Sequence, residues 1–120
     1  MARVFFINSK GKHILVLDLS SMTDVKESVR IIDECEEMIM RLPMKSVCLL
    51  TDVTDSSYDM IGIERLKNFS KSITPFMLAS AVVGAKEEKK MIVDILEKIS
   101  GRSIENFASR NDAVKYLSSF

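Results

Sequence analysis

Two aspartates, Asp18 and Asp52, each close a short apolar run, "ILVL" and "VCLLT". If the runs are neighbouring parallel strands, both carboxylates lie at the sheet edge where α/β proteins tend to bind ligands. Two adjacent carboxyl groups would push their pKa values apart, as acid–base catalysis requires. We favour another interpretation, in which both accept hydrogen bonds from loops 20–23 and 53–55, because no nucleophile, metal-ligand set or histidine accompanies them. The candidate site at these strand ends comprises Asp18, Ser20, Asp52 and Thr54.

The loop after the second run contains Asp55-Ser56-Ser57, so Ser56 and Ser57 are candidate phosphate acceptors. A phosphate at a helix N-terminus gains from the helix dipole and the free amides of the first turn. Here it would also meet the like charges of Asp52, Asp55 and Asp59. Serine and aspartate are common in turns and helix caps for local hydrogen-bonding reasons. We therefore favour a turn over a phosphorylation switch.

A third candidate is the segment "VVGAKEEKK", in which Gly84 and Lys86 could contact an anion at the start of a helix. The segment lacks the glycine spacing of a phosphate-binding loop or a dinucleotide fingerprint. A solvated first helical turn is the more economical explanation. Arg102, which follows Gly101, is expected to be a surface residue rather than a phosphate clamp.

Strands must hold these side chains in place, and the apolar patterns predict five strands. "RVFFINSKGKHILVLDL" predicts a hairpin turning at Lys10-Gly11, with an internal strand from Ile14 to Leu19. "SVCLLTDV" and "FMLASAVVG" predict two strands covered on both faces, and "SIENFAS" predicts a short last strand.

Four helices are predicted between and after these strands. Thr23 is the expected N-cap of the first, which ends at Pro43; the second spans about Asp59 to Ile73. The third runs from about Lys86 to Ser100, burying Ile92, Leu96 and Ile99, with Gly101 as a left-handed C-cap. Ser109 is expected to cap the fourth helix. The resulting order, β–β–α–β–α–β–α–β–α, predicts an α/β fold with a mostly parallel sheet and right-handed crossovers.

Composition sets further limits on function. The 120 residues suit one domain spanning 1–120, and 17 basic residues balance 17 acidic ones, which disfavours nucleic acid as a partner. One histidine and two cysteines give little basis for a metal site, and we expect no cofactor. We see no signal peptide and no stretch of transmembrane length, so we expect a cytoplasmic protein without integral membrane association.

The element order and three segments resemble the small bacterial STAS/SEC14-like (SpoIIAA-like) domain family, whose members include proteins of unassigned function. The segments are "VLDLSSM", "SVCLLTDVTDSSYD" and "ASAVVGAKEEKKMIVDILEKISGRSIENFASRNDAVKYL". The resemblance implies a SpoIIAA-like sheet of about five strands. In anti-sigma-factor antagonists of this kind, a partner kinase phosphorylates a serine in an Asp-Ser-Ser-Gly-Leu pattern. Here Tyr58 and Asp59 replace the glycine and leucine, which weakens that carry-over.

From these observations we expect a non-enzymatic binding or regulatory module for a small apolar ligand or a protein partner. SEC14-like relatives hold lipids, which favours an apolar ligand by analogy. A homodimer is a further candidate, because Ile31, Met38 and Met40 suggest a second apolar strip on the first helix. The first alternative is a phosphorylation-controlled regulator resembling an anti-sigma-factor antagonist, with Ser56 or Ser57 as acceptor. The second is an acid–base enzyme using Asp18 and Asp52.

Overall fold

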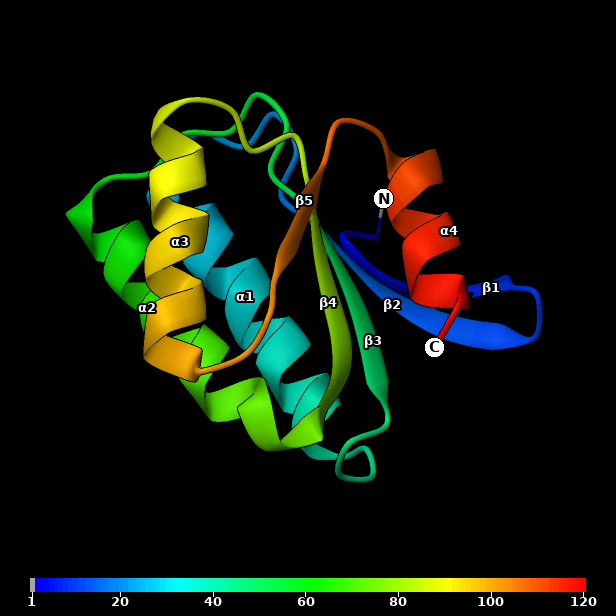
Figure 1. Cartoon of the computed structure of the whole chain (residues 1–120). Helices are drawn as coiled ribbons and strands as arrows, with labels where there is room; N and C mark the ends of the chain where they lie inside the picture. Colours follow the sequence, from blue (N-terminus) through cyan, green and yellow to red (C-terminus); the bar gives the residue numbers. More distant parts are fainter. Residues whose placement is uncertain (1) are drawn as a thin grey trace.

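A five-stranded sheet forms the centre of the molecule in the computed structural model, which describes residues 2–120 (Figure 1). The strands lie side by side in chain order, with β1 antiparallel to β2 and the remaining pairs parallel. Their bounds are Val4–Ser9 (β1), Lys12–Asp18 (β2), Val47–Asp52 (β3), Met77–Val83 (β4) and Glu105–Phe107 (β5). The predicted mixed α/β class, element order and N-terminal hairpin are confirmed.

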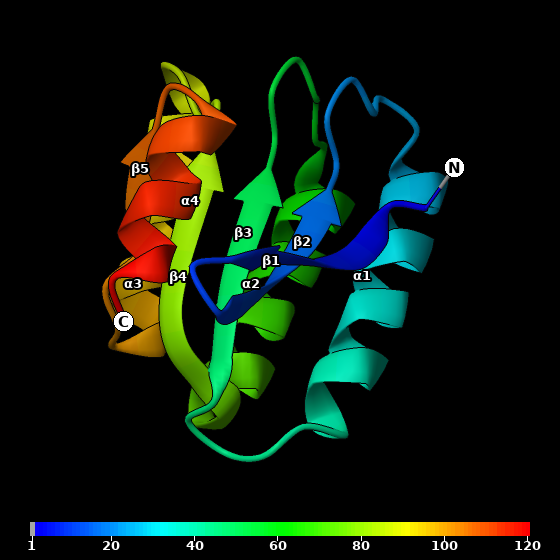
Figure 2. The ribbon, with the colours of Figure 1, turned by 90° about the vertical axis from the view of Figure 1, so that its right-hand side faces the viewer.

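Helices cover both faces of this sheet unequally. Figures 1 and 2 show α1, α2 and α3 on one face and α4 alone on the other. The helices span Val25–Met40 (α1), Met60–Ile73 (α2), Glu88–Ser100 (α3) and Arg110–Ser118 (α4), with a 3₁₀ turn at Thr74–Phe76 (η1) after α2. None of the helices within residues 2–120 combines the length and apolar character needed to cross a membrane.

The core has two halves, one on each face of the sheet. Every residue of β3 is buried, and alternate side chains point to opposite faces. Leu49 packs with the α1–α3 layer, whereas Cys48 and Leu50 pack towards α4. Cys35 of α1 belongs to the first half, so the two free cysteines lie in different halves of the core.

Local turn and cap chemistry explains where most elements begin and end. Lys10 (φ 52°) and Gly11 (φ 78°) form the tight turn of the predicted hairpin. The Asp59 carboxylate accepts a hydrogen bond from the Gly62 amide at 2.9 Å and caps α2. Gly101 ends α3 in the left-handed conformation, with φ 71°. Ser109 caps α4, as expected from the sequence.

Four sequence predictions about the helices are wrong. Asp24, not Thr23, caps α1, because its carboxylate accepts from the Lys26 amide at 3.0 Å and its charge suits the positive helix end. Helix α3 begins at Glu88 rather than Lys86, because Glu87 has a φ of 52° that interrupts the helical path. Two residues were also assigned to the wrong environment: Ile99 is 38% exposed, and Ile31, expected on a spare apolar strip, is buried in the core.

Candidate functional site

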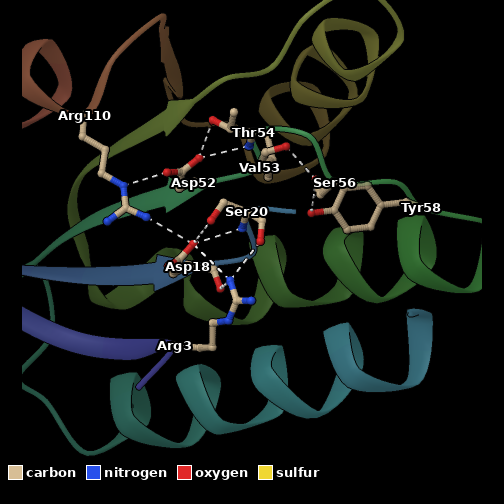
Figure 3. Close-up of polar contacts among 9 residues, drawn as sticks. All are labelled: Arg3, Asp18, Ser20, Asp52, Val53, Thr54, Ser56, Tyr58 and Arg110. Carbon is tan, nitrogen blue, oxygen red and sulfur yellow. Dashed lines mark hydrogen bonds and ion pairs between the residues drawn. The ribbon is translucent and has the colours of Figure 1, made fainter. Parts of the chain in front are cut away.

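The structure brings Asp18 and Asp52 together at the carboxyl ends of β2 and β3, where they are register partners. Arg110, in the first turn of α4, lies between them (Figure 3). Its Nε donates to Asp52 Oδ2 at 2.6 Å, and its Nη2 lies 3.1 Å from Asp18 Oδ1. One guanidinium therefore bridges both candidate carboxylates.

Each aspartate also organises the loop that follows its strand, in the same way. Asp18 Oδ1 accepts from the Ser20 amide at 3.0 Å and the Ser20 hydroxyl at 2.6 Å. Asp52 Oδ1 accepts from the Thr54 amide and hydroxyl at the same two distances. The four candidate residues thus form two equivalent loop caps joined by Arg110. We refer to Arg3, Asp18, Ser20, Asp52, Thr54 and Arg110 as the strand-end cluster.

Arg3 and Arg110 complete this cluster, and sequence reasoning missed both. Arg3 Nη1 donates to the Ser20 carbonyl at 2.9 Å and lies 3.4 Å from Asp18 Oδ1. The Ser109 cap could have indicated Arg110, because the chain between β5 and α4 must turn at this same sheet edge.

Within residues 2–120, no three His, Cys, Asp or Glu side chains are grouped to hold a metal ion.

The charge state of Asp18 follows from these contacts. Burial raises the pKa of its carboxyl, but the Ser20 hydrogen bonds and the Arg110 charge together outweigh burial and hold the pKa below its ordinary value. A general acid needs a carboxyl that stays protonated near neutral pH. The environment of Asp18 favours the ionised form instead.

The two candidate phosphate acceptors lie in different environments. Ser56 is buried, and its hydroxyl donates to the Val53 carbonyl at 2.6 Å and lies 3.1 Å from the Tyr58 hydroxyl (Figure 3). Ser57 is exposed, and its amide donates to the Met22 carbonyl at 3.2 Å. Of the pair, Ser57 offers the hydroxyl that a kinase could reach.

Gly84 is required by packing against the strand-end cluster. With φ 80°, it lies so close to Thr54 that an added Cβ would meet Thr54 Oγ1 at 2.2 Å and Thr54 Cα at 2.8 Å. Its amide already donates to the Phe107 carbonyl at 2.9 Å. Lys86 is exposed and precedes the start of α3 by two residues. The Gly84 amide is therefore already paired, and an anion contact at Lys86 stays a prediction.

A second candidate binding region lies between the sheet and the helices rather than at the strand ends. A cavity of about 60 Å³ opens between β3 and β4 on one side and α2 and α3 on the other. Tyr58 and Lys89 also contribute to its wall. Most of its lining is apolar, including Leu49, Leu66, Phe69, Ile73, Val93 and Leu96.

Arg102 also lines this cavity, and its expected place at the surface is wrong. Gly101 ends α3 in a left-handed turn, and the Arg102 side chain that follows lies half-buried at the cavity wall, near the end of α2. Its Nε donates to Thr74 Oγ1 at 3.1 Å, its Nη1 to Ser80 Oγ at 2.5 Å, and its Nη2 to the Ser70 carbonyl and hydroxyl at 3.2 Å. Burial lowers the pKa of Arg102 to about 10, so it stays charged at neutral pH.

Comparison with known proteins identifies the fold. No family model and no curated protein matches the sequence. The structure is similar to that of an uncharacterized protein of the DUF3478 family with a SpoIIAA-like fold, from Shewanella loihica PV-4. The TM-score is 0.74 at 12% identity, over 95% of this chain and 91% of the other. The fold is SpoIIAA-like. This confirms the resemblance predicted from the sequence at the level of the SpoIIAA-like fold, and identity this low carries no residue roles.

Proposed function

We propose that this SpoIIAA-like chain is a non-enzymatic STAS-like binding module that holds a small apolar ligand between its sheet and helices α2 and α3. The observation that carries the proposal is the cavity lined by Leu66, Phe69, Ile73 and Leu96. Protein interiors are packed nearly as densely as organic crystals, and small-molecule sites are concave and mostly apolar, so this opening is the place in the fold best suited to a small apolar ligand.

The strand-end cluster supports a non-enzymatic role. Asp18 and Asp52 hold Ser20, Thr54 and Arg110 in place through these contacts, a structural role that accounts for both carboxylates without a reaction. We place the protein in the cytoplasm, a proposal supported by two buried, unbridged cysteines.

Native mass spectrometry of the purified protein, with denaturing spectra alongside, tests the proposal. We expect a copurified small mass that is lost on denaturation. The native spectrum also gives the subunit count and so tests the homodimer expected from the sequence. A ligand-free protein that also fails to take up an apolar fluorescent probe would contradict the proposal.

A variant that fills the cavity, paired with a control variant on the same helix, tests whether the cavity is the binding site. Leu96→Phe adds volume at a cavity-lining position of α3, whereas Met91→Phe adds a ring at a position of the same helix that is 67% exposed. We expect Leu96→Phe to abolish binding of the copurified mass or probe and Met91→Phe to leave it unchanged. Thermal unfolding of both variants checks that they fold.

A second candidate function is phosphorylation-controlled binding of a protein partner, with Ser57 as acceptor. The observation that favours Ser57 over Ser56 is its exposure, two residues before the Asp59 cap of α2. Peptide mass spectrometry of the protein isolated from its own cells would show phosphate on Ser57 and not on Ser56. Phosphate on neither residue in growing and starved cells would exclude this candidate.

A further inference from the structure

Arg102 brings a positive charge to the cavity wall without a charged partner. None of the ion pairs within residues 2–120 involves it. Its acceptors are the neutral oxygens of Ser70, Thr74 and Ser80. The C-terminal end of α2 supplies a partial negative charge of about one half, which compensates the guanidinium incompletely. A charge partly withdrawn from water in this way gains stability when an anion joins it.

Hydrogen-bond donors at this place also lack acceptors. A guanidinium has five N–H donors, and Nη1 makes one hydrogen bond, so one of its hydrogens has no acceptor within residues 2–120. The hydroxyls of Ser70 and Ser80 accept from Arg102, and neither donates to another group within the same residues. Both serines are buried and line the cavity with Arg102. Three donors and one positive charge therefore meet at one wall of an apolar cavity.

We propose that the ligand is an aliphatic monocarboxylic acid, with its carboxylate on Arg102, Ser70 and Ser80 and its chain among Leu66, Phe69 and Leu96. This inference rests on the proposed function and specifies its ligand class. A planar monoanion matches the guanidinium of Arg102 in charge and geometry. Lys89, the other cation of the wall, lies at the opposite end of α3, so a phosphate dianion on Arg102 would keep one negative charge uncompensated there. Space for a water-sized group takes about 10–15 Å³, so about 60 Å³ accommodates roughly four to six such groups. The terminal carbons of a longer chain, such as that of octanoate, would extend beyond the cavity.

Octanoate and 1-octanol separate the charged contact from the apolar one, because they share a chain and differ in the head group. Calorimetric titration of the delipidated protein with each gives the two affinities. We expect octanoate to bind about ten- to a hundredfold more tightly, which is the usual advantage of hydrogen bonds to a charged group. Amide chemical shifts should move at Ser70, Ser80 and Arg102 with octanoate. Octyl phosphate should bind more weakly than octanoate.

Arg102→Gln supplies the variant test, because glutamine keeps a hydrogen-bond donor and loses the charge. We expect it to reduce octanoate affinity about tenfold or more and to leave octanol affinity nearly unchanged. Arg30→Gln, at an exposed arginine of α1, is the control and should change neither affinity. If Arg102→Gln fails to fold, Ser80→Ala removes one of the three donors and should lower octanoate affinity selectively.

The outcomes distinguish this inference from the proposed function. Equal binding of octanoate and octanol would overturn the carboxylate assignment and leave an apolar binding module, with Arg102 serving only to cap α2. Tighter binding of octyl phosphate than of octanoate would also overturn it. Binding of none of the three compounds would overturn both proposals.

Discussion

Two arginines of this molecule occupy contrasting environments. Arg110 lies between two carboxylates, with contacts of 2.6 and 3.1 Å, at the carboxyl ends of the strands. Arg102 lies near the opposite edge of the sheet, where α2 gives way to β4, and contacts only neutral oxygens among residues 2–120. Breaking a partly buried pair leaves the remaining charge uncompensated, whereas a partly buried charge without a charged partner is itself a cost to the fold. The comparison therefore assigns Arg110 to stability and points to binding for Arg102.

The largest expected effect is at the strand-end cluster. Asp52→Ala removes a 5% exposed carboxylate that accepts two hydrogen bonds from Thr54 and pairs with Arg110. We expect the free energy of unfolding to fall by about 3 kcal/mol, measured by urea denaturation. Asp94→Ala, at an exposed position of α3, should change it by less than about 0.5 kcal/mol. A loss below about 1 kcal/mol for Asp52→Ala would show that the cluster does not stabilise the fold.

The next effect comes from the contact between Gly84 and the cluster. In Gly84→Ala the new Cβ would fall 2.2 Å from Thr54 Oγ1, and the residue must also keep a positive φ. Overpacking and backbone strain together should cost about 2–3 kcal/mol, measured by thermal unfolding. Gly11→Ala shares the positive φ but has open space around the added Cβ among the described residues, so about 1 kcal/mol is expected. Equal losses would mean that backbone conformation alone requires Gly84.

Replacing each of the two arginines by methionine should give a smaller difference in the free energy of unfolding. Arg110→Met removes the cation between Asp18 and Asp52, leaving Arg3 beside Asp18 alone, and should cost about 2 kcal/mol. Arg102→Met loses hydrogen bonds but also removes an unpaired charge, so the net change should stay below about 1 kcal/mol. Urea denaturation of the ligand-free variants measures both. The reverse order would make Arg102 the structural arginine and remove the contrast.

The smallest effect is the pH dependence contributed by Asp18. Its pKa in the folded protein lies below the ordinary value of 3.8, so it binds protons less readily when folded than when unfolded. Its stabilising contribution is complete above that ordinary value and is lost as the pH falls through the lower, folded value. Urea midpoints between about pH 5 and about pH 2 should therefore fall less steeply for Asp18→Asn than for the wild type. Parallel profiles would show that Arg110 and Ser20 do not favour the charged form of Asp18.

Local sequence signals predicted most of the fold. Helix caps depend on residues that are neighbours in the chain, so the sequence indicates them directly. This holds for Asp59, Ser109 and Gly101. The paired aspartates were also found, because strands of matching pattern end at the same sheet edge. The start of α3 was misplaced because Glu87, a residue without turn chemistry of its own, has a positive φ there.

The partners of those residues depend on long-range packing. Arg110 meets Asp52 across 58 positions of sequence, because α4 crosses to the far face and begins beside β3. Arg102 meets Ser70 across 32 positions, through the meeting of two helix ends. No periodicity within one segment encodes such meetings. The cavity was unpredictable for the same reason, since its walls come from two strands and two helices.

The two cysteines lie in different halves of the core, so the reactivity of each thiol reports on the opening of one half. Burial raises the pKa of Cys35, on the inner face of α1, to about 12, so it reacts with thiol reagents only when the α1 layer opens. Cys48 faces α4, with its Sγ 3.9 Å from the Leu117 carbonyl, and becomes reachable when α4 detaches. Labelling rates at the two thiols therefore time the opening of the two layers separately in the unaltered chain, and an occupant of the cavity should slow the first rate more than the second.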